Sequence, residues 1–191
     1  MQLITLRTID ILLSLVGILL IFPFMLFIYV VGLFVNGSPL IFQTRVGKSG
    51  VLFTLVKFRT MQLKTEQMGT HLVDPSLITR MGRLLRRTKL DEIPQLFNVL
   101  IGHMSLVGPR PCLPSQSELI ALREERGVFN LRPGLTGLAQ INKVDMSTPR
   151  KLARYDSILV KRLSVSLYFD IVVATCMGKG IGDRAREYRA S

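Results

Sequence analysis

The chain has 191 residues, 48% of them hydrophobic, and a formal net charge of +12 at pH 7. This length suits one domain with a small appendage, and the joint excess of apolar and basic residues favours an anionic membrane surface or an anionic substrate as partner. Nucleic-acid binding is disfavoured, because the chain has no interleaved aromatic residues, no zinc-ligand spacing and no recognisable reading module. Its two cysteines, Cys112 and Cys176, lack metal-ligand spacing and indicate reduced, structural thiols in a cytoplasmic compartment.

Residues 11–35 form an apolar run of 25 residues without a charge. As a helix this run would be about 37 Å long, enough to span a bilayer with tilt. Pro23, near its middle, removes one helical hydrogen bond and bends the helix. These residues alone favour a single-span anchor, because many spanning helices tolerate a proline. Arg7 and Asp10, three residues apart, are expected to pair with each other where the segment begins.

Two strands and a hairpin are predicted next. Hydrophobic and β-branched residues indicate strands over 40–45 and 51–58, and the Gly-Lys-Ser-Gly sequence at 47–50 joins them. Lys57 and Arg59 lie on one face at the end of the second strand, because alternate strand residues point the same way. Two cations in this position are suited to binding phosphate.

A basic helix and an acidic pair follow. Residues 62–76 are polar and predict a mobile loop, and residues 77–90 predict an amphipathic basic helix. The adjacent carboxylates Asp91 and Glu92 precede Pro94 and an apolar-spaced segment, which is typical of a helix start. At the positive end of a helix dipole and beside arginines, the ionised form of Asp91 is favoured, as a nucleophile or a metal ligand requires. The alternative is a simple helix cap.

Arg110 stands between Pro109 and Pro111, and this makes it a stiffly presented bidentate donor of the kind that binds phosphate. A basic run, an acidic pair and this arginine, all within about thirty residues, indicate phosphoryl chemistry with a divalent ion. Further along the chain, a glycine-rich loop is predicted at 132–137 and helices at 115–126, 149–163 and 166–177.

These motifs resemble those of the bacterial sugar transferases, the monotopic phosphoglycosyl transferases. The resemblance spans essentially the whole chain, and its blocks are KFRTM at 57–61, LDEIPQLFNVL at 90–100, GHMSLVGPRP at 102–111 and RPGLTGLAQ at 132–140. It implies an α+β fold with a re-entrant membrane helix-break-helix, a small β-hairpin, and amphipathic interfacial helices around the active site. The break would fall at Pro23. The implied parts are an anchoring segment at 1–36, a catalytic domain at 37–178 and a charged tail at 179–191.

The resemblance also implies a reaction. A sugar-1-phosphate, of the N-acetylated hexosamine type, would pass from a UDP-sugar to polyprenyl (undecaprenyl) phosphate with release of UMP. This would be the first membrane step in assembly of an O-antigen, capsule, exopolysaccharide or glycoprotein. Asp91 would form a covalent phospho-sugar intermediate, and Glu92 with Asp91 would hold Mg²⁺. The implied phosphate-binding residues are Lys57, Arg86 (with Arg87 as its alternative) and Arg110, and the implied site wall comprises Arg59, Arg132, Gln140 and Asp170.

Location and partners follow from the same resemblance. It implies a monotopic enzyme on the cytoplasmic face of the bacterial inner membrane, in contact with anionic phospholipid and with downstream glycosyltransferases, and it leaves homo-oligomer formation open. Two other functions remain compatible with the residues. One is a non-catalytic basic membrane adaptor, and the other is a glycosyltransferase that releases UDP.

Overall fold

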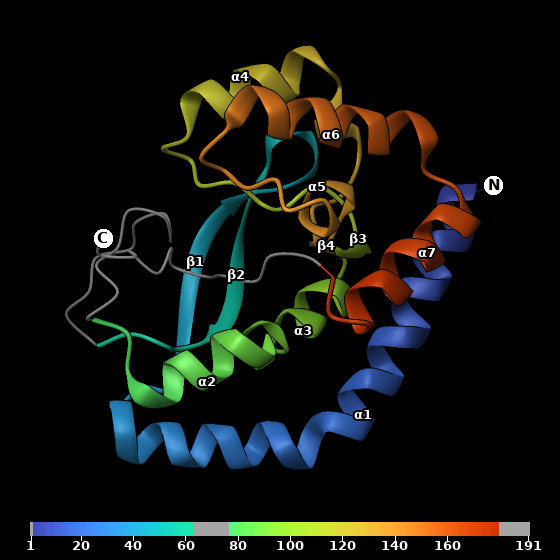
Figure 1. The fold of residues 1–191 in the computed structure, drawn as a ribbon. Helices are drawn as coiled ribbons and strands as arrows, with labels where there is room; N and C mark the ends of the chain where they lie inside the picture. Colours follow the sequence, from blue (N-terminus) through green and yellow to red (C-terminus); the bar gives the residue numbers. More distant parts are fainter. Residues whose placement is uncertain (1, 63–76, 180–191) are drawn as a thin grey trace.

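The computed structural model describes residues 2–62 and 77–179 and shows a mixed fold of helices and short strands (Figure 1). The helices are α1 (Gln2–Asn36), α2 (Arg80–Thr88), α3 (Gln95–Leu100), α4 (Ser117–Glu125), α5 (Leu138–Ile141), α6 (Pro149–Arg162) and α7 (Val165–Cys176). The strands are β1 (Leu40–Val46), β2 (Leu52–Phe58), β3 (Ser105–Val107) and β4 (Gly134–Thr136). The predicted loop at 62–76 and the predicted tail at 179–191 lie outside the described residues except for their first residues, Gln62 and Lys179.

The predicted hairpin is confirmed. Strands β1 and β2 pair antiparallel from Leu40 opposite Phe58 to Val46 opposite Leu52, and a 3-10 turn, η1 (Lys48–Gly50), joins them. The hydrophobic and β-branched residues of the two segments and the glycine-containing turn between them were sufficient signals for this element.

A second, parallel sheet was not predicted. Strand β3 pairs with β4, with Ser105 opposite Gly134 and Val107 opposite Thr136. Three-residue strands are too short to show a hydrophobic alternation. A Cβ at Gly134 would lie 2.0 Å from the backbone nitrogen of Gly108, so only glycine permits this close approach of the two segments. The sheet therefore joins the third and fourth of the signature blocks, at 102–111 and 132–140.

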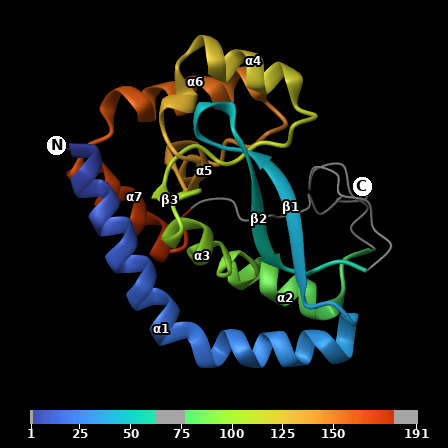
Figure 2. The ribbon, with the colours of Figure 1, turned by 180° about the vertical axis from the view of Figure 1, so that it is seen from behind.

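Helix α1 bends near its middle, as Pro23 predicts (Figures 1 and 2). The part of α1 before Pro23 is called the first arm and the part after it the second arm, and the two arms lie along different faces of the rest of the molecule. The buried residues of the first arm recur every four positions: Leu6, Asp10, Ser14 and Ile18. Most of the large apolar side chains of α1 are exposed. Leu3–Val35 is long and apolar enough to cross a membrane. Only 22% of its most apolar 18-residue stretch is buried within the protein, and this exposure indicates membrane association.

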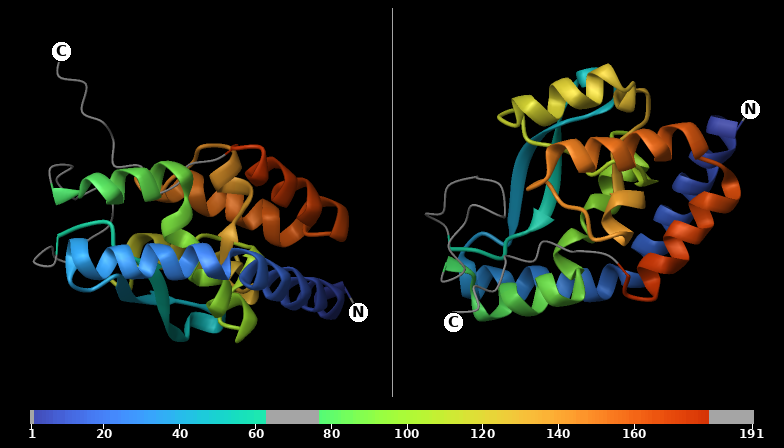
Figure 3. Two further views of the ribbon diagram at one scale, coloured as in Figure 1. Left: turned by 90° about the horizontal axis from the view of Figure 1, so that it is seen from below. Right: turned by 45° about the horizontal axis from the view of Figure 1, so that its top comes forward.

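The core consists of three clusters, two of which lie between α1 and the other elements. One cluster joins the first arm to α3, β3 and α7, and another joins the second arm to α2 and the end of β2. Figure 3 shows α7 beside the first arm and α2 beside the second. A third cluster fills the space among α4, α5 and α6.

The expected ion pair between Arg7 and Asp10 does not form. The Arg7 guanidinium donates to the carbonyls of Val99, at 2.7 Å, and Leu100, at 2.9 Å, whereas Asp10 accepts hydrogen bonds from β3 and α7. The prediction was wrong because it assumed a helix facing solvent and lipid. Both residues instead face the folded domain, where stronger, more buried partners are available.

Candidate active site

The acidic pair lies in a 3-10 turn, η4 (Leu90–Glu92), between α2 and α3. Asp91 and Glu92 are both buried, with 2% and 7% of their surfaces exposed. The pair was predicted at a helix start, just before an apolar-spaced segment, and it lies just before α3, which Pro94 caps. Their flanking residues, Leu90 and Ile93, pack into the apolar cluster formed with the second arm of α1. The turn that carries the carboxylates therefore packs directly against α1, the long apolar helix.

Arg110 forms an ion pair with Glu92, the second residue of the acidic pair. Its Nη2 lies 2.8 Å from Glu92 Oε1, and its side chain is 20% exposed while that of Glu92 is 8% exposed. Arg110 follows β3, so the parallel sheet delivers it to the turn that carries Glu92. A partly buried, charge-assisted hydrogen bond of this length is among the stronger polar contacts in proteins.

The backbone on both sides of Arg110 is held by hydrogen bonds to four consecutive carbonyls. The donors are Gly134 N to Pro109 O at 2.8 Å, Arg123 Nη1 to Arg110 O at 2.9 Å, Arg45 Nη1 to Pro111 O at 3.4 Å, and Val46 N to Cys112 O at 3.0 Å. These donors come from three separate parts of the chain, since Arg45 and Val46 are neighbours at the end of β1. The two prolines stiffen the segment further, because their φ angles are fixed. Arg110 is thus preorganised before any ligand binds.

A buried ion pair supports this segment. The Nε and Nη2 atoms of Arg123 lie 3.0 and 2.7 Å from Asp156 Oδ2, and each residue is 1% exposed. Burial raises the pKa of the Asp156 carboxyl above its ordinary value, and the charge and hydrogen bonds of Arg123 oppose this rise. Sequence reasoning missed Arg123, because it sits among other charged residues on a helix that looks solvent-exposed.

The phosphate-binding candidates Lys57 and Arg86 are buried on the inner side of the fold. Lys57 is the second-last residue of β2, a strand that packs against η4. Arg86 Nε donates to Thr60 Oγ1 at 2.9 Å, whereas its alternative, Arg87, is exposed. The structure therefore turns Arg86 inward from α2. Thr60, which orients it, had no signal of its own apart from its place in the KFRTM block.

The four candidates for the site wall have other contacts. Arg59 donates to the carbonyls of Ser38 and Leu40, at 2.9 and 3.2 Å, and so holds the link from α1 to β1. Arg132 Nε donates to Gly102 O at 2.9 Å, beyond the end of α3.

Gln140 donates to Leu135 O at 3.0 Å, and its buried Oε1 has no partner among the described residues. Asp170 is exposed, and no hydrogen bond or ion pair joins it to an arginine in the described part of the chain. Asp156 is the carboxylate that orients Arg123.

The described residues contain no group of three or more His, Cys, Asp or Glu side chains that could hold a metal ion by themselves. Mg²⁺, however, is commonly bound by one or two carboxylates together with substrate phosphates and water. Asp91 and Glu92 supply such oxygens, and Oε1 alone of the Glu92 carboxylate is engaged in an ion pair within the described residues. The donor set therefore fits Mg²⁺ held jointly with a phosphate-bearing substrate.

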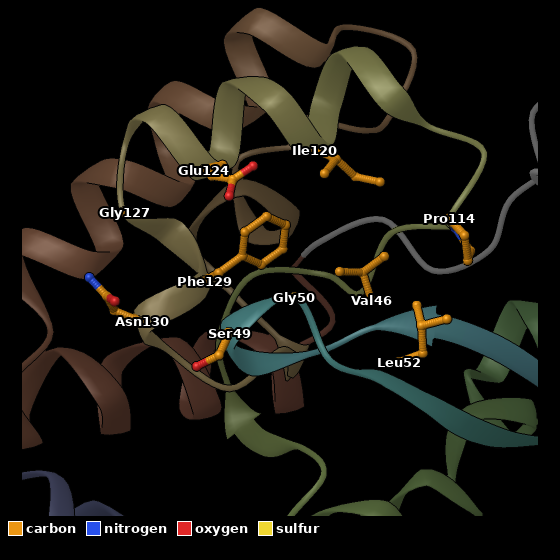
Figure 4. Close-up of a pocket in the computed structure, with 10 residues that line it drawn as sticks. All are labelled: Val46, Ser49, Gly50, Leu52, Pro114, Ile120, Glu124, Gly127, Phe129 and Asn130. Carbon is orange, nitrogen blue, oxygen red and sulfur yellow. The ribbon is translucent and has the colours of Figure 1, made fainter.

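A hollow of about 480 Å³ lies away from these residues, between the hairpin tip and α4 (Figure 4). Glu124 of α4 and Phe129 of the next 3-10 turn, η5 (Val128–Asn130), line it opposite Val46 and Leu52 of the hairpin. None of its lining residues is cationic, and Glu124 would repel an anion. The hollow is therefore unsuited to a diphosphate substrate.

Comparison with known proteins gives several extended matches. The chain is 33% identical over 201 residues to the exopolysaccharide production protein ExoY of Rhizobium meliloti, covering 91% of this chain and 86% of that protein. It is 35% identical over 189 residues to the undecaprenyl-phosphate galactose phosphotransferase of Salmonella typhimurium, covering 87% of this chain and 38% of that protein. It is 48% identical over 107 residues to the uncharacterized sugar transferase EpsL of Bacillus subtilis, covering 56% of this chain and 52% of that protein.

The chain thus spans about half, or less, of the length of some of these relatives, including the sugar transferase of Haemophilus influenzae, of which it covers 38%. The family model described as "Bacterial sugar transferase" matches residues 1–179, which is nearly the whole sequence. With this match and the ExoY similarity, the chain belongs to the bacterial sugar transferase family.

Proposed function

We propose that this protein transfers a sugar-1-phosphate from a UDP-sugar to polyprenyl phosphate and releases UMP. The observation that carries the proposal is the ion pair between Arg110 and Glu92, which sets a preorganised guanidinium beside two buried carboxylates. The names of two relatives support the reaction class. One is the UDP-glucose:undecaprenyl-phosphate glucose-1-phosphate transferase of Xanthomonas campestris, 36% identical over 183 residues, and the other is the galactose phosphotransferase above.

In the proposed reaction Asp91 acts as the nucleophile. One of its carboxylate oxygens attacks the phosphorus that bears the sugar, the bond from this phosphorus to the UMP oxygen breaks, and UMP leaves with the bonding electrons. An oxygen of polyprenyl phosphate then attacks the same phosphorus and displaces the Asp91 carboxylate. The product is a polyprenyl diphosphate sugar, and the enzyme is regenerated.

The cations and Glu92 have separate roles in this proposal. Arg110, Arg86 and Lys57 stabilise the negative charge that spreads over the transferring phosphoryl group. Glu92, with Asp91, would hold Mg²⁺, which neutralises charge on the diphosphate and on the leaving UMP. In the ligand-free protein Arg110 neutralises Glu92, so we expect this ion pair to loosen when substrate phosphates arrive.

The test is a product assay on Asp91→Asn. The wild-type protein, in a membrane or detergent with polyprenyl phosphate, should release UMP from a panel of UDP-sugars, including UDP-N-acetylhexosamines. Asp91→Asn should release none and should retain no covalently bound labelled sugar. Release of UDP would indicate glycosidic-bond formation instead, and no turnover of any UDP-sugar would favour a non-catalytic adaptor. Full activity of Asp91→Asn would overturn the covalent mechanism.

We also propose that α1 enters and leaves the membrane on one face, the cytoplasmic one. Its C-terminal end continues into β1, and near its N-terminal end Arg7 and Asp10 bond to α3 and β3 of the same domain. A straight spanning helix would place these two ends on opposite sides of a bilayer, where such contacts are impossible. The bend near Pro23 supports the re-entrant path, because it lets both arms meet one domain while apolar side chains face outward.

Cysteine labelling tests this topology. Leu3 is exposed, so Leu3→Cys in a Cys176→Ser background gives one accessible thiol, the buried Cys112 being left in place. An impermeant maleimide should label this thiol only after the inner membrane is opened. Labelling in intact spheroplasts would show a spanning helix. Pro23→Ala should increase that labelling, since it restores the missing hydrogen bond and removes the bend.

A further inference from the structure

The first arm of α1 directs two ionisable side chains at the catalytic domain. Asp10 is 2% exposed, and Arg7 is half-buried. Ionisable residues on an apolar membrane segment are costly, and they usually face protein and serve a function. Neither residue belongs to the motifs assigned to the reaction, so their contacts need another explanation.

The Asp10 carboxylate joins three segments of the chain. Its Oδ1 accepts hydrogen bonds from Ser105 Oγ at 3.0 Å, from Leu106 N at 2.9 Å and from Tyr168 Oη at 2.7 Å. Two of these donors belong to β3 and the third to α7. Burial first, and then the hydrogen bond and charge of Asp10, raise the pKa of Tyr168 above its ordinary value, so the phenol remains a donor at physiological pH.

The Arg7 guanidinium binds the C-terminal end of α3. It donates to the carbonyls of Val99 and Leu100 at 2.7 and 2.9 Å, and Arg132 donates to Gly102 O just beyond them at 2.9 Å. Cations stabilise a helix at this end, because its last carbonyls are unpaired and carry the negative pole of the dipole. Arg7 thus fixes the far end of the helix that follows Glu92.

The two contacts act on the two partners of the catalytic ion pair. Strand β3, held by Asp10, leads directly to Arg110, whereas α3, held by Arg7, follows the turn that carries Glu92. Arg7 and Asp10 are one helical turn apart on α1, so a single rigid element sets both partners. The hollow beside Asp10 holds only about 70 Å³, room for a few water molecules and too little for a sugar nucleotide.

We propose that Arg7 and Asp10 are positioning residues for the transfer reaction, and that the first arm of α1 is a part of the active-site framework as well as an anchor. This inference rests on the proposed function. It predicts that loosening the arm lowers turnover even when the protein stays folded and membrane-bound. The effect would pass through β3 and α3 to the separation of Arg110 from Glu92.

The experiment compares Asp10→Asn and Tyr168→Phe with two matched controls. Tyr155→Phe removes a hydroxyl that has no hydrogen-bond partner among the described residues, and Thr8→Ala changes an exposed residue on the same arm. We expect kcat for UMP release to fall about 10- to 100-fold in Asp10→Asn and Tyr168→Phe, the usual scale for a small misplacement of catalytic groups. KM for the UDP-sugar and the membrane-bound fraction should not change, and both controls should match wild type.

The double variant supplies the second readout. Because Asp10→Asn keeps a side-chain oxygen that can accept from Tyr168, the double variant uses Asp10→Ala. If Asp10 and Tyr168 act through one hydrogen bond, Tyr168→Phe should cause no further loss in the Asp10→Ala background. Unchanged kcat in Tyr168→Phe, or a loss explained wholly by less protein in the membrane, would overturn the inference while the proposed function stands. If wild type itself transfers nothing, the proposed function fails. The positioning role is then judged by amide exchange, which should quicken at Leu106 in Asp10→Ala, where the acceptor is lost, and stay at the wild-type rate if the inference is wrong.

Discussion

Replacing Arg123 by Met, alone and together with Asp156→Leu, should distinguish what Arg123 contributes to the stability of the protein from what it contributes to activity. The substitution leaves the Asp156 carboxylate buried and without its partner, since Asp156 is 1% exposed and both of its hydrogen bonds come from Arg123. Breaking a buried ion pair from one side typically costs about 3–5 kcal/mol. For a protein of this size, such a loss lowers the unfolding midpoint by roughly 6 to 20 °C. The single variant should therefore be clearly destabilised.

Removing both partners should restore the stability but not the activity. In Arg123→Met with Asp156→Leu no charge is left buried, and well-packed apolar replacements of ion pairs are often neutral or stabilising. The carbonyl of Arg110 nevertheless loses the donor that lies at 2.9 Å, so the segment that presents Arg110 is held less firmly. We expect the double variant to unfold near the wild-type temperature and to release UMP about tenfold more slowly.

The assay needs thermal unfolding in detergent and UMP release from the same preparations. Arg126→Met is the matched control, because the ion pair of Arg126 with Glu125 lies at the surface, with the two side chains 32% and 71% exposed. Its loss should shift stability by less than about 1 kcal/mol. A double variant with full activity would refute the idea that Arg123 supports Arg110. A single variant as stable as wild type would refute the energetic reasoning.

Three further outcomes follow from the site. Arg110→Lys keeps the charge but loses the planar two-donor group, so UMP release should fall about 10- to 100-fold, and wild-type kinetics would make Arg110 structural. Glu92→Gln should also reduce turnover and be partly rescued by excess Mg²⁺, and a loss that Mg²⁺ does not change would argue against Glu92 as a ligand. In Gly82→Ala the new Cβ would lie 2.0 Å from Thr60 O, so α2 must move. That should lower the free energy of unfolding by about 1–3 kcal/mol, measurable as a lower unfolding midpoint.

Local signals in the sequence predicted the elements well, but they did not predict most contacts between them. The hairpin followed from two hydrophobic, β-branched segments joined by a glycine-containing turn, and α6 begins at Pro149, the first residue of the helix predicted over 149–163. The parallel sheet was missed, because it depends on backbone contact between Gly108 and Gly134, which are far apart in the sequence. Glycines at such a contact read as turn residues until the fold brings the segments together.

The charged residues show the same limit of local sequence signals, which do not identify partners that are distant in the sequence. Arg110 was singled out by its two prolines, and the structure places it against Glu92. The support behind it, from Arg123 and Asp156, could not be predicted, because each lies on a helix whose pattern suits a solvent-exposed face. Arg7 and Asp10 were noticed only as a local pair. A spacing of three residues shows that two charges can meet, but it does not show that better partners exist elsewhere in the fold.

The packing of the turn that carries the acidic pair against α1 explains how a soluble nucleotide and a lipid phosphate could meet at one site. Leu90 and Ile93, which flank Asp91 and Glu92, pack on the inner side of the second arm, with Met25 and Ile28. On the same arm Leu26, Phe27 and Val30 are exposed, and in the proposed topology they face lipid. One helix, about 10 Å across, therefore separates the carboxylates from the lipid-facing surface. That places the acidic pair near the level of the headgroups, where the phosphate of a polyprenyl chain would lie. A straight helix in place of the bent one would keep the apolar anchor but would not hold the turn in this position, and we therefore propose that the bend serves catalysis as well as anchoring.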